Sequence, residues 1–213
     1  MDFYRNKGAT LAAGFTGMIF FGVSFVIMGA VLPSLIDKFG LDTTSASTLA
    51  GLLPLGILTG SVIFGPVIDR FGYKILIITA SLVTMAGLEL LAFCNTAQMA
   101  RFAIFLIGFG GGTLNGLTNA LVSDISDDKS RASNLSILGL FYTVGAIAIP
   151  LLFATLSKST TYVTIVSSAG ALVLLPVIFY FFVQFPEAKF KQGIPISKMA
   201  SLFKEPFLII LSF

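Results

Sequence analysis

Charged residues recur at regular intervals along this chain of 213 residues, and the long stretches between them carry almost none. Five stretches are free of charge, and they cover residues 8–36, 43–68, 102–123, 132–157 and 159–186. A sixth, over residues 75–100, contains only Glu89. A helix needs about 20 apolar residues to cross the hydrocarbon core of a bilayer, so each stretch is long enough to span it. The pattern predicts an all-α membrane protein.

The predicted spans cover residues 10–33, 45–67, 75–94, 101–123, 133–156 and 161–183. Hydrophobic residues make up 56% of the chain and charged residues 11%, against roughly half and a quarter in soluble domains. The apolar run after Arg5 and Lys7 is too long for a signal-peptide core, so we expect the first span to be retained. Another apolar run starts at Pro206 and stops at Phe213, which suggests a truncated seventh span.

These spans predict three parts: a six-helix bundle over 1–183, a cytoplasmic linker over 184–205, and the start of a seventh span over 206–213. The linker contains Pro186, Gly193 and Pro195, with four lysines and two glutamates. Ile196, Met199 and Phe203 fall on one helical face, which would suit a helix lying on the inner leaflet. A flexible connector fits this composition equally well.

The basic residues predict the orientation of the spans. With the N-terminus in the cytoplasm, the three basic residues on the outer side are Lys38, Arg101 and Lys158. The ten on the inner side are Arg5, Lys7, Arg70, Lys74, Lys129, Arg131, Lys189, Lys191, Lys198 and Lys204. Cytoplasmic loops of membrane proteins carry the excess of Lys and Arg. We therefore expect a multi-pass protein of the plasma or inner membrane with a cytoplasmic N-terminus.

The composition argues against enzymes and nucleic-acid binders. The chain has no histidine, which removes Ser-His and Cys-His pairs and HExxH zinc sites, and Cys94 has no second cysteine to pair with. The net charge of +3 follows the alternate loops, as membrane topology requires, and forms no nucleic-acid surface. We expect no catalytic residue, metal or cofactor.

The joint after the second span reads GPVIDRFGYK, from Gly65 to Lys74, and resembles the signature of the major facilitator superfamily. That signature is Gly, three variable residues, Asp-Arg, one variable residue, Gly and two basic positions. The sequence matches it at Gly65, Asp69, Arg70, Gly72 and Lys74, whereas Tyr73 occupies the first basic position. The resemblance implies the N-terminal half of a 12-helix transporter, built of two inverted three-helix repeats. A weak echo between residues 46–66 and 132–150 supports such repeats.

The resemblance also implies a gate. In the family this aspartate faces a helix terminus of the other six-helix half and holds the inner gate shut. Gly65 permits close helix approach, and Gly72 can adopt the positive φ of a tight turn. Arg70 is expected to reach Asp124, which lies at the same depth at the end of the fourth span.

The fourth span carries two polar side chains one turn apart. Asn115 and Asn119 share a stripe, beside a stripe of small residues formed by Gly108, Gly112, Gly116 and Ala120. Asparagines in hydrocarbon need a partner or water, so the polar stripe faces protein or a cavity. Asn115 lies about 4 Å from the middle of the span, which makes it the first candidate for solute contact. Hydrogen bonds between helices are the alternative role. Weaker candidates are Thr16, Ser24 and Tyr142.

The same span resembles the fucose:proton symporter family, which carries Leu-Glu, three residues and Asn. Leu114 and Asn119 match this pattern, whereas Asn115 replaces the acid and cannot carry a proton. A sugar is therefore the favoured solute, with proton coupling through position 115 in question. We favour an interhelix carboxylate for Glu89 over a proton carrier. Drug:proton antiporters usually carry Gly-Pro in the fifth span, but here Gly145 is not followed by proline.

The functional expectation is a secondary active transporter that moves a small polar solute by alternating access, with a proton or sodium ion as possible coupling ion. Its expected partners are the lipid bilayer and the missing C-terminal six-helix half. Two alternatives remain: an exporter or antiporter of another small molecule, and a six-span membrane sensor or assembly protein that transports nothing.

Overall fold

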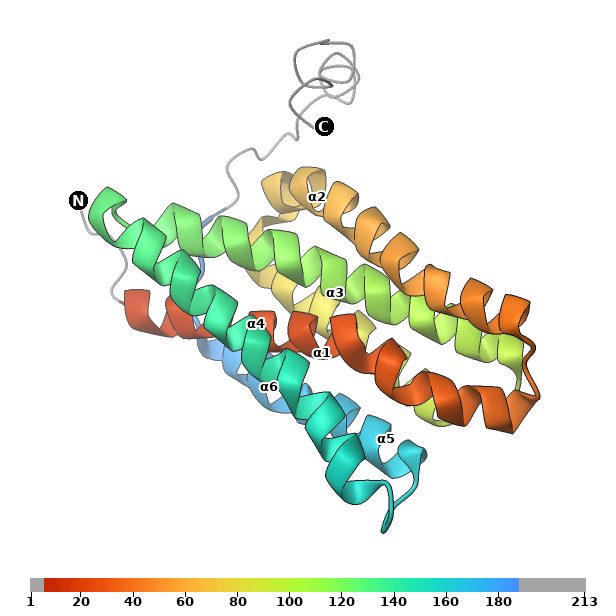
Figure 1. Cartoon of the computed structure of the whole chain (residues 1–213). Coiled ribbons are helices and arrows are strands. Elements are labelled where there is room, and N and C mark those ends of the chain that lie inside the picture. The colour runs from red at the N-terminus through yellow and green to blue at the C-terminus, as the bar shows by residue number, and fades with distance from the viewer. Residues whose placement is uncertain (1–5, 188–213) are drawn as a thin grey trace.

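The computed structural model describes residues 6–187, so the N-terminal five residues, nearly all of the predicted linker and the predicted seventh span lie outside the described residues (Figure 1). The helices in this range are α1 (Lys7–Phe39), α2 (Thr43–Ala92), α3 (Ala97–Ile125), α4 (Asp128–Leu156), α5 (Tyr162–Leu172) and α6 (Leu174–Phe182). They form one bundle in which α2 doubles back on itself (Figure 1).

The 50 residues of α2 make two crossings of the bundle. Gly72 has φ 78° and ψ 172°, a conformation outside the helical region that a residue with a Cβ rarely adopts. It separates a first arm (residues 43–71) from a second arm (residues 73–92). At the other end of the chain, α5 and α6 are separated only by Val173 and form a single span from Tyr162 to Phe182. Residues 6–187 therefore contain six spans, and the predicted all-α fold is confirmed.

Two close helix pairs form the framework of the bundle. On one side, a Cβ added to Gly22 of α1 would overlap the backbone of α4, and one added to Gly145 of α4 would overlap the backbone of α1. On the other side, Gly56 and Gly60 of the first arm of α2 meet the backbone of α3 in the same way. Small residues allow such close packing, which stabilises helix pairs in lipid through van der Waals contact.

These pairs agree with a bundle of two three-helix repeats. In such a bundle, α1 corresponds to α3, the first arm of α2 to α4, and the second arm of α2 to the α5–α6 span. The close pair of α1 and α4 then corresponds to the close pair of α3 and the first arm. The predicted small-residue stripe takes part in this packing, because Gly108 and Gly112 face the backbone of the first arm and Gly116 faces the ring of Phe64.

Burial is unequal among the spans. In α4 only Leu138, Gly145 and Ile149 are buried. Its outer face exposes the apolar side chains of Leu140, Val144, Ile147, Leu151, Leu152 and Leu156. An exposed apolar surface of this extent needs lipid or another protein surface to cover it.

Candidate functional site

The signature segment forms the hairpin between the two arms of α2. Asp69 and Arg70 end the first arm, Gly72 makes the turn, and Tyr73 and Lys74 begin the second arm. The positive φ predicted for Gly72 is present. A Cβ added to Gly65 would meet nothing within 4 Å, so the close helix approach expected there is not made with any residue of 6–187.

Tyr73, which stands at the first basic position of the signature, binds the acid at the end of α3. Its hydroxyl donates to Asp124 Oδ2 at 2.6 Å, and its side chain is 5% exposed. No ion pair joins Arg70 to Asp124 within residues 6–187, where Arg70 is exposed and lies over the ring of Phe71, 5.2 Å from its centroid. The turn at Gly72 lies between the two residues, so Tyr73 begins the second arm whereas Arg70 ends the first.

Lys74 joins the hairpin to the end of the last span. Its Nζ donates to the carbonyl oxygen of Phe181 at 2.7 Å, close to the end of α6. A lysine at a helix C-terminus satisfies a free carbonyl group and interacts favourably with the helix dipole. The hydroxyl of Thr10 in α1 donates to the carbonyl of Gln184 at 2.9 Å, which attaches the same segment to the first span.

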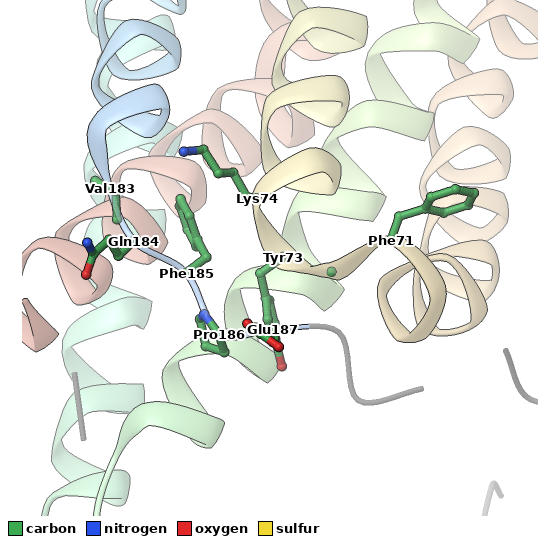
Figure 2. A pocket seen from close by; sticks show the side chains of 9 residues that line it. Phe71, Tyr73, Lys74, Val183, Gln184, Phe185, Pro186 and Glu187 are labelled. Atoms are coloured by element: carbon green, nitrogen blue, oxygen red, sulfur yellow. The ribbon is translucent and has the colours of Figure 1, made fainter. Parts of the chain in front are cut away.

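A cleft of about 600 Å³ lies between this hairpin and the segment that follows α6. Its walls are Phe71–Lys74 and Val183–Glu187. Figure 2 shows Tyr73 and Lys74 pointing in opposite directions, Lys74 toward the end of α6 and Tyr73 toward Pro186 and Glu187. The side chain of Phe71 points away from the cleft (Figure 2).

Asp69 is the one residue of the signature for which a partner beyond this bundle is expected. It is half-buried, and it makes no hydrogen bond or ion pair within residues 6–187. The same end of the bundle carries the ion pair between Lys7 Nζ and Asp127 Oδ2 at 2.9 Å. The hydrogen bond from Lys7 lowers the pKa of the exposed Asp127 carboxyl.

Asn115 and Asn119 bind each other along α3. The Asn119 amide nitrogen donates to Asn115 Oδ1 at 3.1 Å and to the Asn115 carbonyl at 2.9 Å. Asn119 is exposed and Asn115 is half-buried, so the pair lies at the surface of the bundle, outside its core. The amide nitrogen of Asn115 donates no hydrogen bond to any described residue, so two donors remain for a further ligand.

The weaker solute candidates lie in different surroundings. Ser24 is fully buried against Gly111, and its hydroxyl donates to the Phe20 carbonyl at 2.7 Å, so it has no surface to offer a solute. The hydroxyl of Thr16 binds its own helix and lies 3.0 Å from the hydroxyl of Tyr180, which is also fully buried. Each hydroxyl donates to a carbonyl of its own helix, as small hydroxyl side chains in helices usually do.

Tyr142 of α4 is half-buried in an aromatic cluster with two residues of α1. Its ring centroid lies 5.4 Å from that of Phe21 and 6.1 Å from that of Phe25. A second aromatic pair, Phe15 and Phe141, stacks at 4.9 Å between the same two helices. Nothing in the chain pattern around Tyr142 predicts these contacts, because they depend on how α1 and α4 align.

Glu89 lies between two spans. Its Oε2 accepts a hydrogen bond from the Ser167 hydroxyl of α5 at 2.7 Å, and the absence of a side chain at Gly170 makes room for the carboxylate. Within residues 6–187, no group of three or more His, Cys, Asp or Glu side chains could hold a metal ion.

Comparison with known proteins agrees with this geometry. The family model described as Major Facilitator Superfamily matches residues 13–213. The chain is 34% identical over 151 residues to the sodium-dependent glucose transporter 1 of Rattus norvegicus, covering 71% of this chain and 30% of that protein. It is 26% identical over 203 residues to the class H tetracycline resistance protein of Pasteurella multocida, covering 92% and 50%. The chain thus spans half or less of these relatives.

Solved structures show the same fold. The peptide transporter POT in complex with sulfate superposes with a TM-score of 0.75 at 20% identity, covering 95% of this chain and 44% of that one. A proton:xylose symporter bound to 6-bromo-6-deoxy-D-glucose superposes with a TM-score of 0.76 at 14% identity, covering 84% and 45%. Both matches cover one half of a transporter fold. The six spans, the signature at the α2 hairpin and the family match show that the chain belongs to the major facilitator superfamily.

Proposed function

We propose that the chain is part of a secondary active transporter that moves a small polar solute, with sugars as the favoured class, by alternating access across the plasma or inner membrane. The observation that carries the sugar assignment is the Asn115–Asn119 pair. Amide groups both donate and accept hydrogen bonds, as sugar hydroxyls do, and Asn115 has donors that no described residue uses. The rat relative named as a glucose transporter supports the same class.

The experiment is uptake by the reconstituted full-length protein, measured for a panel of hexoses, pentoses and inositol. Each solute is tested with a proton gradient, with a sodium gradient and with neither. We expect saturable uptake of at least one sugar that other sugars inhibit. Transport of an aromatic acid, a peptide or a tetracycline, with no sugar competing at millimolar concentration, would contradict the sugar assignment.

Export of another small molecule is the second candidate. It is favoured by the similarity to the tetracycline resistance protein, which covers 92% of this chain. The absence of proline after Gly145 in α4 counts against a drug antiporter of the usual type. Resistance of cells that overproduce the full-length protein to tetracycline, compared with cells that carry an empty vector, separates the two candidates.

We also propose that Glu89 holds two spans together and is not the proton carrier. Its carboxylate already binds Ser167, at the boundary between the second arm of α2 and α5. Glu89→Gln keeps an acceptor oxygen for that hydroxyl but cannot titrate. We expect the variant to keep the pH dependence of uptake, measured between pH 5.5 and about 8. Loss of that dependence would make Glu89 the proton carrier.

A further inference from the structure

Two tyrosines occupy the same position at the start of two different spans. Tyr73 is the first residue after the break at Gly72, and Tyr162 is the first residue of α5. Each binds a charged side chain at the penultimate position of another helix. Tyr73 binds Asp124 of α3 at 2.6 Å, and Lys38 of α1 binds the Tyr162 hydroxyl at 2.8 Å.

These contacts correspond under the repeat described above. The second arm of α2 matches the α5–α6 span, and α1 matches α3, so each contact joins the start of the third span of one repeat to the end of the first span of the other. They lie at opposite ends of the bundle. The ion pair of Lys7 with Asp127 places the start of α1 beside the end of α3, and therefore the end of α1 at the far end.

The chemistry of tyrosine explains how one residue type serves both ends. A phenol hydroxyl donates to a carboxylate and accepts from an ammonium group. Lys38 makes a further bond, since its Nζ donates to the Cys94 carbonyl just beyond the second arm at 2.7 Å, and it lies 5.4 Å from the ring centroid of Tyr162. At this end Lys38 thus connects three spans.

Such contacts matter in a bilayer because lipid is as apolar as the helix surfaces, so burial of apolar area does little to hold one span against another. The α5–α6 span shows this dependence. Much of its apolar surface is exposed, at Leu172, Leu174, Leu175, Ile178, Phe181 and Phe182. Polar contacts join it to the rest of the bundle at Tyr162, Ser167 and Tyr180.

We propose that Lys38–Tyr162 and Tyr73–Asp124 are a matched pair of clasps, one at each end of the bundle, that fasten the second arm of α2 and the α5–α6 span to α1 and α3. These two contacts hold the six spans together as a single unit. The Lys38 clasp at the end opposite the signature is therefore as important for the integrity of the bundle as the contact between Tyr73 of the signature and Asp124 of α3.

Cys94 is a built-in reporter for the Lys38 clasp. It is fully buried, so it reacts slowly with a membrane-impermeant maleimide. The experiment labels the full-length protein in proteoliposomes from both sides and quantifies the modified Cys94 peptide by mass spectrometry. Lys38→Met and Tyr162→Phe should each raise the labelling rate about fivefold, because each removes a hydrogen bond that involves a charged group. The gain in access to the buried thiol should outweigh the loss of the Lys38 charge and the Tyr162 hydroxyl, which both favour the thiolate form of Cys94.

Three variants serve as controls. Lys158→Met changes an exposed lysine in the loop before α5 and should leave the labelling rate unchanged. Lys38→Arg keeps the charge and the donors, so it should label at nearly the parental rate. Tyr73→Phe should leave Cys94 labelling unchanged and lower the thermal midpoint by about 2–4 °C, as Tyr162→Phe should.

Parental labelling rates in both Lys38→Met and Tyr162→Phe would overturn the proposal. So would a lowered thermal midpoint in only one of the two tyrosine variants, because the contacts would then not be a matched pair. Neither measurement requires a transported solute, so the result does not depend on the proposed function. Tyr162→Phe removes a single oxygen atom, which keeps the test usable if Lys38→Met fails to accumulate.

Discussion

Asp69 has the environment expected of a residue whose partner lies outside residues 6–187. It is half-buried at the end of the first arm of α2 and binds nothing within residues 6–187. A carboxylate facing a helix N-terminus contributes about 0.3–1 kcal/mol, and up to about 2 kcal/mol when it is partly buried. This range is sufficient to bias two conformations without fixing either of them.

We therefore expect Asp69→Asn in the full-length protein to reduce initial uptake rates by several-fold, and by up to about 30-fold at the upper end of that range. The amount of protein in the membrane should stay the same, because the substitution breaks no described contact. Asp128→Asn is the matched control, since Asp128 is exposed and, among the residues that the structure describes, its one ion pair is with Arg131 on its own helix. Equal uptake by the Asp69 and Asp128 variants would remove Asp69 from the mechanism.

Asn115 and Asn119 differ in what they have left to offer a ligand. Asn119 uses its amide nitrogen on Asn115, whereas Asn115 keeps its own donors. Asn115→Ala should raise KM for the transported solute about five- to tenfold, as expected for the loss of one or two hydrogen bonds, with a smaller effect on kcat. Asn119→Ala should have the weaker effect on KM. If the two alanine variants bind solute as the parent does, the pair acts only between or within helices.

For single residues, the sequence predicted the features that depend on the identity of a residue and its position in a helix. The positive φ of Gly72 follows from the signature, and the polar stripe of Asn115 and Asn119 follows from the helical period. The contact of Tyr73 with Asp124 did not follow, because equal depth in the membrane says nothing about the direction in which a side chain points. Tyr73 at a basic position was the available signal for that contact.

Among the elements, the contact between α1 and α4 rests on two glycines. Gly145→Val should sharply lower the yield of folded protein, because its side chain would overlap the backbone of α1 near Ile19. Gly139→Val on the same helix is the matched control, since a Cβ there meets nothing within 4 Å. Monodisperse protein recovered by fluorescence-detected size-exclusion chromatography gives the measurement. Equal recovery of the two variants would show that α1 and α4 do not need this close approach.

The spacing of charges predicted where the helices lie more accurately than the residues at which they begin and end. Charges mark where a span leaves the hydrocarbon, but helices continue into the interface: α1 ends at Phe39 and α4 begins at Asp128, each several residues beyond the expected bound. The joint between the second and third spans proved to be little more than Gly72, because one positive φ is sufficient to reverse the chain. The pairing of α1 with α4 could not be predicted, since small residues occur on many faces.

For the whole molecule, the structure shows which side chains lie at each end of the bundle, and the side of the membrane that each end faces is a separate question. The structure places Lys7, Tyr73, Lys74 and Asp127 at one end of the bundle and Lys38, Cys94 and Tyr162 at the other. The end with Lys7 and Lys74 carries the larger number of basic residues, and this excess predicts that it faces the cytoplasm.

The direction can be measured with one introduced cysteine at a time, because the native Cys94 is fully buried and gives a low background. Lys158→Cys lies in the loop before α5 and Lys129→Cys lies at the start of α4, and both positions are exposed. An impermeant maleimide added to intact cells should label position 158 and leave position 129 unmodified until the cells are opened. The opposite pattern would place the N-terminus outside, and the α2 hairpin with Asp69 would then face the exterior, where it could not close an inner gate.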